Sequence, residues 1–280
     1  HLPYYMSQIL RTEVSMSKII NIISNSNFES RRTTTRLIQK LKEHHFNPTT
    51  TLSPKAALTI TIGGDGAFIK AVNHTKFSST PIVGINTGHL GFYQEISPDK
   101  LDEFIEDYKN NRYQVEQLPI LSAEIYTNQK KYYAQAINEI VLKAQNSKVI
   151  HMNIFVDRNH LEKFSGDGML VATPSGTSGY NLSLGGSLVH PEVDAMAMTP
   201  LAGISSSSYR SMKSTIVFPG HHVISLVPER RYANSNLVLI DGREHSYSQF
   251  KRINIQFSDK RINKLVFENN YWENIKSKFL

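Results

Sequence analysis

The first 112 residues alternate short apolar runs with amphipathic stretches. The apolar runs predict buried strands at residues 18–23, 58–62 and 81–86. The amphipathic stretches, in which apolar residues recur at helical spacing, predict helices over 30–45, directly after residue 66, and over 98–108. Strands and helices in this strict alternation favour a parallel sheet, which binds ligands at the carboxyl ends of its strands.

Beyond about residue 112 the pattern changes to short segments in which apolar and polar residues alternate. These segments predict strands at 121–126, 134–142, 151–156, 169–172, 214–218, 223–227, 237–240 and 253–257. Closely spaced strands with turns between them indicate an antiparallel or mixed β region. The end of the chain, 271–280, has a helical pattern again.

The two patterns together predict an α/β protein of two domains. We expect a Rossmann-like amino-terminal domain over 16–112, joined by the tail 268–280, which packs back on it. A β-rich, β-sandwich-like carboxyl-terminal domain is expected over 113–267. Residues 1–15 lack an apolar signal core, and we expect them to be an artificial leader or an alternative start before Met16.

Composition narrows the function classes. The 280 residues are 40% hydrophobic, enough for a packed core, and include no cysteine. The absence of cysteine excludes disulfides and thiolate chemistry and is typical of the reducing cytoplasm. No apolar run approaches the roughly 20 residues that span a bilayer, so we expect no membrane partner.

The formal net charge of +7 favours anionic partners. Nucleic acid is not expected, because basic residues form no run longer than two and aromatic platforms are not interleaved with them. A small polyphosphate needs only a local basic site.

Three glycines and one carboxylate stand where a predicted strand ends and a predicted helix begins, at Gly63-Gly64-Asp65-Gly66. Free backbone N–H groups and the positive end of the helix dipole suit phosphate there, and glycine lets a ligand approach the backbone. Asp65 would repel phosphate unless it holds a metal ion or takes a proton from a hydroxyl. An ordinary strand-to-helix turn is the alternative.

Two further clusters resemble ligand loops. Residues 86–92 form a glycine-containing loop after the third strand, although such a loop alone is more typical of a packing turn. Residues 165–168 read Ser-Gly-Asp-Gly, and the Gly/Ser/Thr-rich segment 173–181 follows and opens a helix. Its hydroxyl and N–H groups could bind a ribose or a phosphate, and an ordinary capped helix is the alternative.

Taken together, these pieces resemble the NAD kinase family, which phosphorylates NAD to NADP, over residues 19–280. Gly-Gly-Asp-Gly is shared with a wider superfamily that includes lipid kinases and phosphofructokinases. The specific part of the resemblance is its combination with the following pieces: residues 86–92, Asn138-Glu139, 166–168, 173–180 and 184–191.

The resemblance implies a role for each matching residue. Asp65 would be the catalytic base that acts on the ribose 2′-hydroxyl, with positioning supplying most of the effect because a carboxylate is a weak base. The cofactor-binding set is implied as follows: Gly63, Gly64 and Gly66 for the phosphates, Phe92 for a base, Asn138 for adenine or its ribose, Glu139 for a ribose diol, Asp167 for the nicotinamide ribose or amide, and Ser175, Ser178 and Tyr180 for the adenine and ribose pocket.

Three positions depart from the family pattern. Ala67 stands where a hydroxyl residue is usual, Gly179 where alanine is usual, and Gly242 where some relatives have histidine. We therefore expect no polar contact from Ala67 and looser packing at Gly179.

No histidine spacing predicts a protein-built metal site, so Mg²⁺ or another divalent cation is expected to arrive with ATP. NAD and ATP are the expected partners, polyphosphate stays open as a donor, and the resemblance implies a homo-oligomer, either a dimer or a tetramer. A lipid or sphingoid kinase and a non-catalytic dinucleotide sensor are the alternatives, which Asn138-Glu139 and the intact Asp65 disfavour.

Overall fold

Two β-sheets organise the chain in the computed structural model, which describes residues 17–88, 91–207, 210–268 and 271–279. The ten-stranded sheet contains β1 (Ile19–Ser24), β2 (Asn47–Thr49), β3 (Leu58–Gly63), β4 (Ile82–Asn86), β5 (Gln114–Thr127), β6 (Lys131–Ala136), β8 (Ile150–Val156), β9 (Asn159–Gly166), β13 (Ile224–Pro228) and β16 (Phe250–Val266). The six-stranded sheet contains β7 (Glu139–Ala144), β10 (Gly168–Ala172), β11 (Ala195–Leu201), β12 (Ile216–Pro219), β14 (Asn236–Ile240) and β15 (Arg243–His245).

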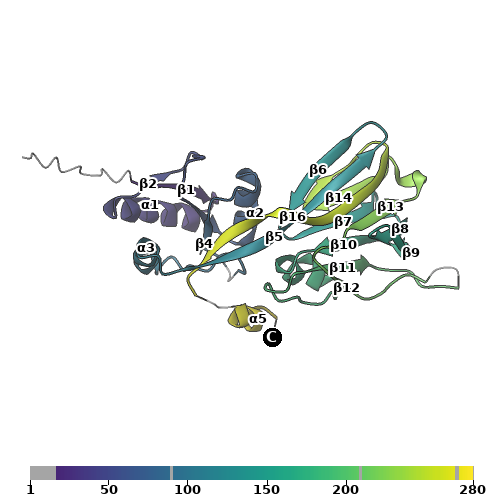
Figure 1. The fold of residues 1–280 in the computed structure, drawn as a ribbon. Coiled ribbons are helices and arrows are strands. Elements are labelled where there is room, and N and C mark those ends of the chain that lie inside the picture. Colours follow the sequence, from purple (N-terminus) through teal and green to yellow (C-terminus); the bar gives the residue numbers. More distant parts are fainter. Residues whose placement is uncertain (1–16, 89–90, 208–209, 269–270, 280) are drawn as a thin grey trace, which may run out of the picture.

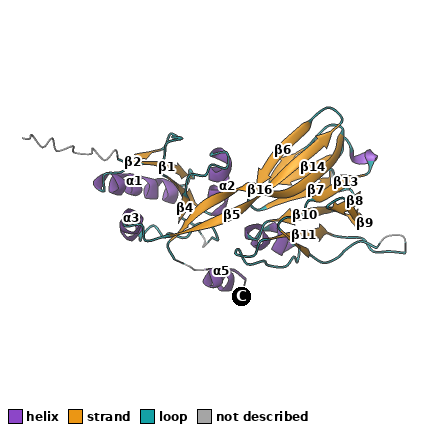
Figure 2. Cartoon of the chain, viewed as in Figure 1, coloured by secondary structure: helices purple, strands orange, loops and turns teal. Residues whose placement is uncertain are grey.

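Helices gather in the amino-terminal half, as Figure 2 shows. They are α1 (Phe28–Glu43), α2 (Asp65–His74) and α3 (Leu101–Lys109); the one-turn helix α4 (Tyr180–Ser183) and the terminal helix α5 (Tyr271–Phe279) lie elsewhere. Short 3-10 turns occur at η1 (Ser175–Ser178) and η2 (Arg230–Tyr232).

The amino-terminal half is a parallel sheet in the order β2-β1-β3-β4 with helices on both faces. α1 and α3 bury Leu37 and Phe104 in one cluster, whereas α2 buries Phe68 in another, against the alternate side chains of the strands. β3 is buried along its whole length, as a central parallel strand should be.

The carboxyl-terminal half is a β-sandwich. Strands of the ten-stranded sheet supply buried residues such as Ile125 and Ile224, and the six-stranded sheet supplies Leu142, Met169 and Val238 to the same core cluster. This arrangement and the parallel amino-terminal sheet confirm the predicted fold class.

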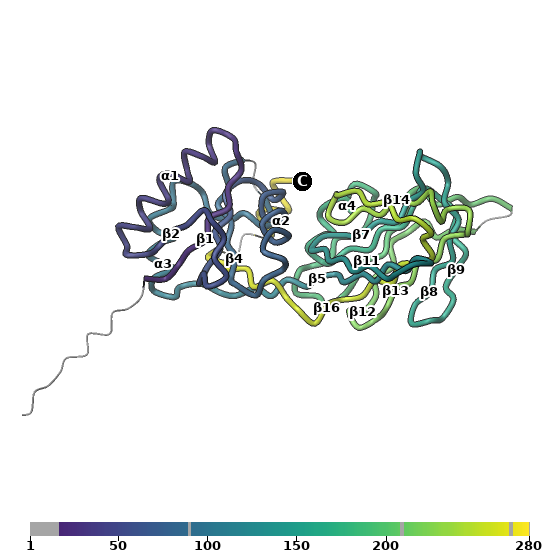
Figure 3. The backbone as a smooth tube through the Cα atoms, turned by 90° about the horizontal axis from the view of Figure 1, so that it is seen from above, coloured from purple at the N-terminus to yellow at the C-terminus, as the bar shows by residue number. Residues whose placement is uncertain are grey.

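Two long antiparallel strands connect the halves (Figure 1). β5 and β16 pair from Gln114↔Val266 to Thr127↔Phe250, and β16 continues the parallel sheet by pairing Lys264 with Ile82 of β4. The view from above shows both strands running from one half into the other (Figure 3). The sequence pattern predicted only part of each strand, namely residues 121–126 of β5 and 253–257 of β16. The domain boundaries that we predicted, 112/113 and 267/268, lie next to the end of this strand pair at which Gln114 faces Val266. They stay a proposal.

The prediction of a single strand over residues 134–142 is wrong. The chain leaves the ten-stranded sheet at Ala136 and enters the six-stranded sheet at Glu139. The break occurs because the N–H groups of Ile137, Asn138 and Glu139 bond to the Asp241 carboxylate. Four strands of the described residues were missed: β2, β9, β11 and β15. β9 is mostly exposed in its first half, and β11 contains Pro200, a residue that argues against a strand.

The terminal segment packs on the amino-terminal half, where the Phe267 ring meets the Phe104 ring edge-on at 5.1 Å. α5 then lies beside both halves (Figure 1). Within the described ranges, no helix is long and apolar enough to span a membrane.

Candidate active site

The turn between β3 and α2 leaves open space in front of the helix. A Cβ atom on Gly63, whose φ is +154°, would lie 2.6 Å from the Asn25 side-chain nitrogen, so packing and backbone both require glycine there. A Cβ on Gly64 or Gly66 would have no neighbour within 4 Å among the residues that the structure describes. Ala67 is buried, its side chain has no polar atom, and its backbone N–H donates to the carbonyl of Gly64 at 2.8 Å. The amino end of α2 is therefore accessible to a ligand.

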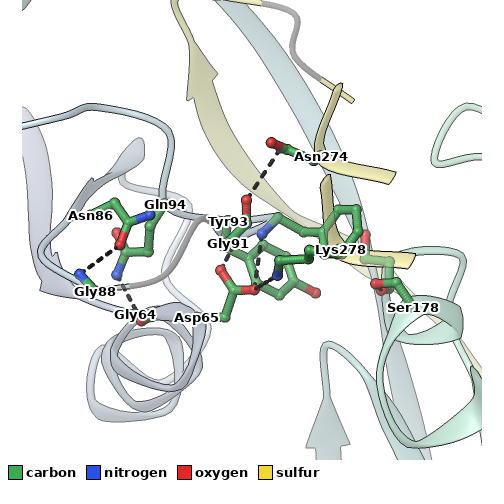
Figure 4. A network of polar contacts seen from close by, with 12 residues as sticks. Gly64, Asp65, Asn86, Gly88, Gly91, Tyr93, Gln94, Ser178, Asn274 and Lys278 are labelled. Carbon is green, nitrogen blue, oxygen red and sulfur yellow. Dashed lines mark hydrogen bonds and ion pairs between the residues drawn. The ribbon is translucent and has the colours of Figure 1, made fainter. Parts of the chain in front are cut away.

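Asp65 is held by the loop that follows β4. Its Oδ2 accepts the N–H of Phe92 at 2.9 Å, and its Oδ1 accepts the N–H of Tyr93 at 2.9 Å (Figure 4). A Cβ on Gly91 would lie 2.0 Å from Oδ1, so a larger residue would displace the carboxylate. The Asp65 side chain is 29% exposed, and the ammonium of Lys278 lies 3.6 Å from Oδ2. The carboxylate is thus oriented and accessible.

Gln94 stabilises the same turn through its side chain. Its side-chain amide donates to the carbonyl of Gly64 at 3.0 Å and accepts the hydroxyl of Thr61 at 3.0 Å. A Cβ on Gly84 would collide with this side chain. His89 and Leu90, part of the loop singled out in the sequence, lie outside the described residues.

Asn138 and Glu139 lie at the point where the chain changes sheets. The Asp241 carboxylate accepts the N–H of Asn138 at 2.8 Å and that of Glu139 at 3.3 Å, which fixes their backbone. The Tyr93 hydroxyl donates to Asn138 Oδ1 at 2.5 Å. Burial raises the pKa of Tyr93, so its hydroxyl keeps its proton. Tyr93 therefore joins the loop that holds Asp65 to the predicted NAD-binding pair.

Glu139 is 6% exposed, and its Oε2 has no hydrogen-bond partner among the described residues. Burial, reinforced by the charge of Asp241, raises the pKa of Glu139 to about 8. A Cβ on Gly179 would lie 3.7 Å from this oxygen. A buried polar atom normally has a partner, so this carboxyl group suits a ligand hydroxyl.

The η1 turn lies against the same pair. A Cβ on Gly176 would lie 2.1 Å from the Asn138 carbonyl oxygen, so the turn fits only because Gly176 has no side chain. Ser178 Oγ donates to the carbonyl of Ser175 at 3.0 Å. Ser175 and Ser178 line a cavity of about 530 Å³ together with Phe92 and Tyr93. The structure thus brings both serines close to the loop after β4 that holds Asp65, which we call the Asp65 loop.

Three residues predicted to bind the nucleotide have surroundings that do not test this role. Asp167 is exposed at the opposite end of β10 from Thr173, so the structure does not bring it to Asp65 within this chain. Tyr180 packs partly against the buried cluster of Val141 and Leu170. The Phe92 ring stacks on the Phe279 ring of α5 at 5.9 Å. Their roles in binding stay predictions.

Sequence reasoning missed three residues of this site: Tyr93, Asp241 and Lys278. Asp241 follows an apolar strand, which could have indicated it, but its positive φ of +47° is visible only in the structure. Lys278 lies in a helix at the far end of the chain, and nothing in its local pattern indicates the site.

The part of the chain that the structure describes contains no group of three or more His, Asp or Glu side chains placed to hold a metal ion. The carboxylate of Asp65 at the open amino end of α2 nevertheless fits a cation carried by phosphate oxygens, because hard cations prefer oxygen ligands.

Family models match most of the chain. Residues 7–113 match the ATP-NAD kinase N-terminal domain, and residues 137–266 match the ATP-NAD kinase C-terminal domain. The NAD kinase of Finegoldia magna is 43% identical over 269 residues, which cover 94% of this chain and 98% of that relative. NAD kinase 1 of Listeria innocua is 32% identical over 80% of this chain and 85% of its own length.

Solved structures have the same fold. Yeast NADH kinase complexed with NADH superposes with a TM-score of 0.82 at 20% identity, covering 95% of this chain and 88% of that one. An NAD kinase from Archaeoglobus fulgidus in complex with ATP gives a TM-score of 0.75 at 22% identity, covering 92% of this chain and 99% of that one.

Proposed function

This chain belongs to the NAD kinase family, and on that premise we propose that Asp65 accepts the proton of the NAD ribose 2′-hydroxyl during phosphoryl transfer. The protein phosphorylates NAD with ATP. The position of Asp65 carries this assignment. Its carboxylate lies at the open amino end of α2 and binds the N–H groups of Phe92 and Tyr93. The Tyr93 hydroxyl in turn donates to Asn138.

The step conserves atoms and charge. The 2′-oxygen forms a bond to the terminal phosphorus of ATP, the bond from that phosphorus to the bridging oxygen breaks, and ADP leaves. The hydroxyl proton goes to the Asp65 carboxylate. A weak base suffices because the proton leaves late in a loose transition state, and the two N–H groups that fix Asp65 supply orientation.

The residues around Asn138 would hold the nucleotide. Glu139 offers a buried oxygen that has no partner in the described part of the chain, and we assign this oxygen to a ribose diol. We assign Asn138 to the adenine or its ribose. We assign Ser175 and Ser178, which line the neighbouring cavity, to the adenine and ribose pocket. Gly64 and Gly66 leave room for phosphate at the amino end of α2. A divalent cation bound to the triphosphate would neutralise charge there.

The relatives do not favour a lipid kinase. Polyphosphate as an additional donor, a homo-oligomer of two or four chains and a cytoplasmic location stay proposals.

The first prediction concerns Asp65. Incubation with NAD, ATP and Mg²⁺ should yield NADP, and Asp65→Asn should lower kcat by about 100- to 10,000-fold while the dissociation constant for NAD stays within a few-fold. Asp259→Asn is the matched control because Asp259 is exposed on β16. Full activity of Asp65→Asn would exclude Asp65 as the base, and NAD binding without any NADP from the unmodified protein would support a sensor.

A further inference from the structure

The terminal helix α5 is fixed on the Asp65 loop by several contacts. Asn274 is 5% exposed, and its side chain donates to the carbonyl of Gly91 at 3.2 Å (Figure 4). The rings of Tyr271 and Phe279 meet the Phe92 ring at 6.2 and 5.9 Å. On its other side, the Tyr271 ring contacts the His190 ring at 4.7 Å, in the β-rich half. The helix is therefore positioned by both halves of the molecule.

The position of α5 places one ammonium group, that of Lys278, beside Asp65. Lys278 lies one turn beyond Asn274, on the same face of α5. Its Nζ is 3.6 Å from Asp65 Oδ2 and 4.4 Å from the centroid of the Phe92 ring. The side chain is 27% exposed, so both water and a ligand can reach it.

Asp65 does not need Lys278 as a hydrogen-bond partner. Each carboxylate oxygen already accepts a backbone N–H at 2.9 Å, whereas 3.6 Å is too long for a good hydrogen bond. Over the described ranges, Lys278 is the cation that pairs with Asp65, while Lys264, which lines the neighbouring cavity, is committed to Glu95 and Glu116.

We propose that Lys278 is a catalytic residue that contacts the transferring phosphoryl group. Phosphoryl transfer depends on cations placed where negative charge lies in the transition state. Asp65 marks the position of the attacking oxygen, and an ammonium group beside it can reach the equatorial oxygens of the phosphorus under attack. The pairing with Asp65 and Phe92 holds Lys278 in place before ATP binds.

This inference rests on the proposed function, and NADP formation by the unmodified protein tests that function separately. Lys278→Met removes the charge and keeps the length of the side chain. It should lower kcat by on the order of 100-fold and leave the dissociation constant for NAD within about twofold, because the loss is specific to the transition state. Lys278→Arg should retain most of the activity. Lys276→Met is the matched control, since Lys276 lies exposed on the same helix.

A chemical rescue separates charge from folding. The chain has no cysteine, so Lys278→Cys introduces a single thiol. Alkylation with 2-bromoethylamine forms a C–S bond, releases bromide and restores an ammonium at nearly the original reach. Activity should return at least tenfold with this reagent and stay low with bromoethane, which adds the same two carbons without the charge.

The one tryptophan in the chain, Trp272, reports on docking because its ring lies 5.6 Å from the His190 ring. Its fluorescence should be the same in Lys278→Met and the unmodified protein. The proposal is overturned if Lys278→Met keeps kcat within about threefold, if it turns over faster, as an inhibitory plug would, or if bromoethane rescues Lys278→Cys as well as bromoethylamine.

Discussion

Single carboxylates organise this site by binding backbone N–H groups. Asp65 accepts the N–H groups of Phe92 and Tyr93, and Asp241 accepts those of Ile137, Asn138 and Glu139. In both cases an acidic side chain fixes a loop at which strand pairing stops. The loop geometry around the predicted substrates therefore depends on two residues, although only one of them was indicated by a motif.

At this scale, we predict that Asp241→Asn loosens the Asn138-Glu139 turn. An asparagine keeps one acceptor oxygen and places an NH₂ group against a backbone N–H. The free energy of unfolding should fall by about 1–3 kcal/mol, and NAD should bind more weakly. Urea unfolding and calorimetric NAD titration measure the two effects, with Asp259→Asn as control. Unchanged values in both assays would show that the turn holds without Asp241.

The elements that matter most are the long strands β5 and β16, which carry the sheet from one half to the other. Lys264 of β16 pairs with Glu95, after β4, and with Glu116 of β5. The Lys264 side chain is 5% exposed and that of Glu95 is 9% exposed. Burial raises the pKa of Glu95 although Lys264 acts in the opposite direction. This ion cluster ties both long strands to the segment after β4.

We therefore predict that Lys264→Met destabilises the protein by about 3–5 kcal/mol, because it leaves a buried carboxylate without a cation. The double variant Lys264→Met, Glu95→Gln should recover most of the loss, since the remaining groups are neutral or partly exposed. Lys251→Met, on an exposed position of β16, is the control. Urea midpoints that are equal for the single and double variants would contradict this role.

At the scale of the whole molecule, buried acids make stability depend on pH. The pKa of Glu139 rises from 4.5 to about 8 on folding, and burial also raises the pKa of Asp241. A carboxyl group with a raised pKa in the folded state contributes stability below its unfolded pKa and loses it as pH rises through its folded pKa. Ionisation of Glu139 should therefore lower stability progressively from about pH 4.5 to about pH 8, and the full cost remains at higher pH.

We predict that Glu139→Gln has the stability of the unmodified protein at pH 4.5 and exceeds it by up to a few kcal/mol at pH 9. Thermal or urea unfolding without nucleotide, repeated across this range, measures the difference. Glu244→Gln, an exposed position, should show no such slope. Parallel pH profiles for Glu139→Gln and the unmodified protein would mean that Glu139 ionises normally.

Local periodicity determined the parallel amino-terminal sheet, the helices on it and most strands of the β-rich half. It could do so because the spacing of apolar residues follows from which face of a helix or strand is buried. The sequence also indicated Asp65 and Asn138-Glu139 through their motifs. Only the tertiary structure decided where the strand predicted at 134–142 breaks, that Tyr93 joins the two loops, and that Lys278 reaches Asp65. These features depend on contacts between residues far apart in the chain, whose partners no local pattern specifies.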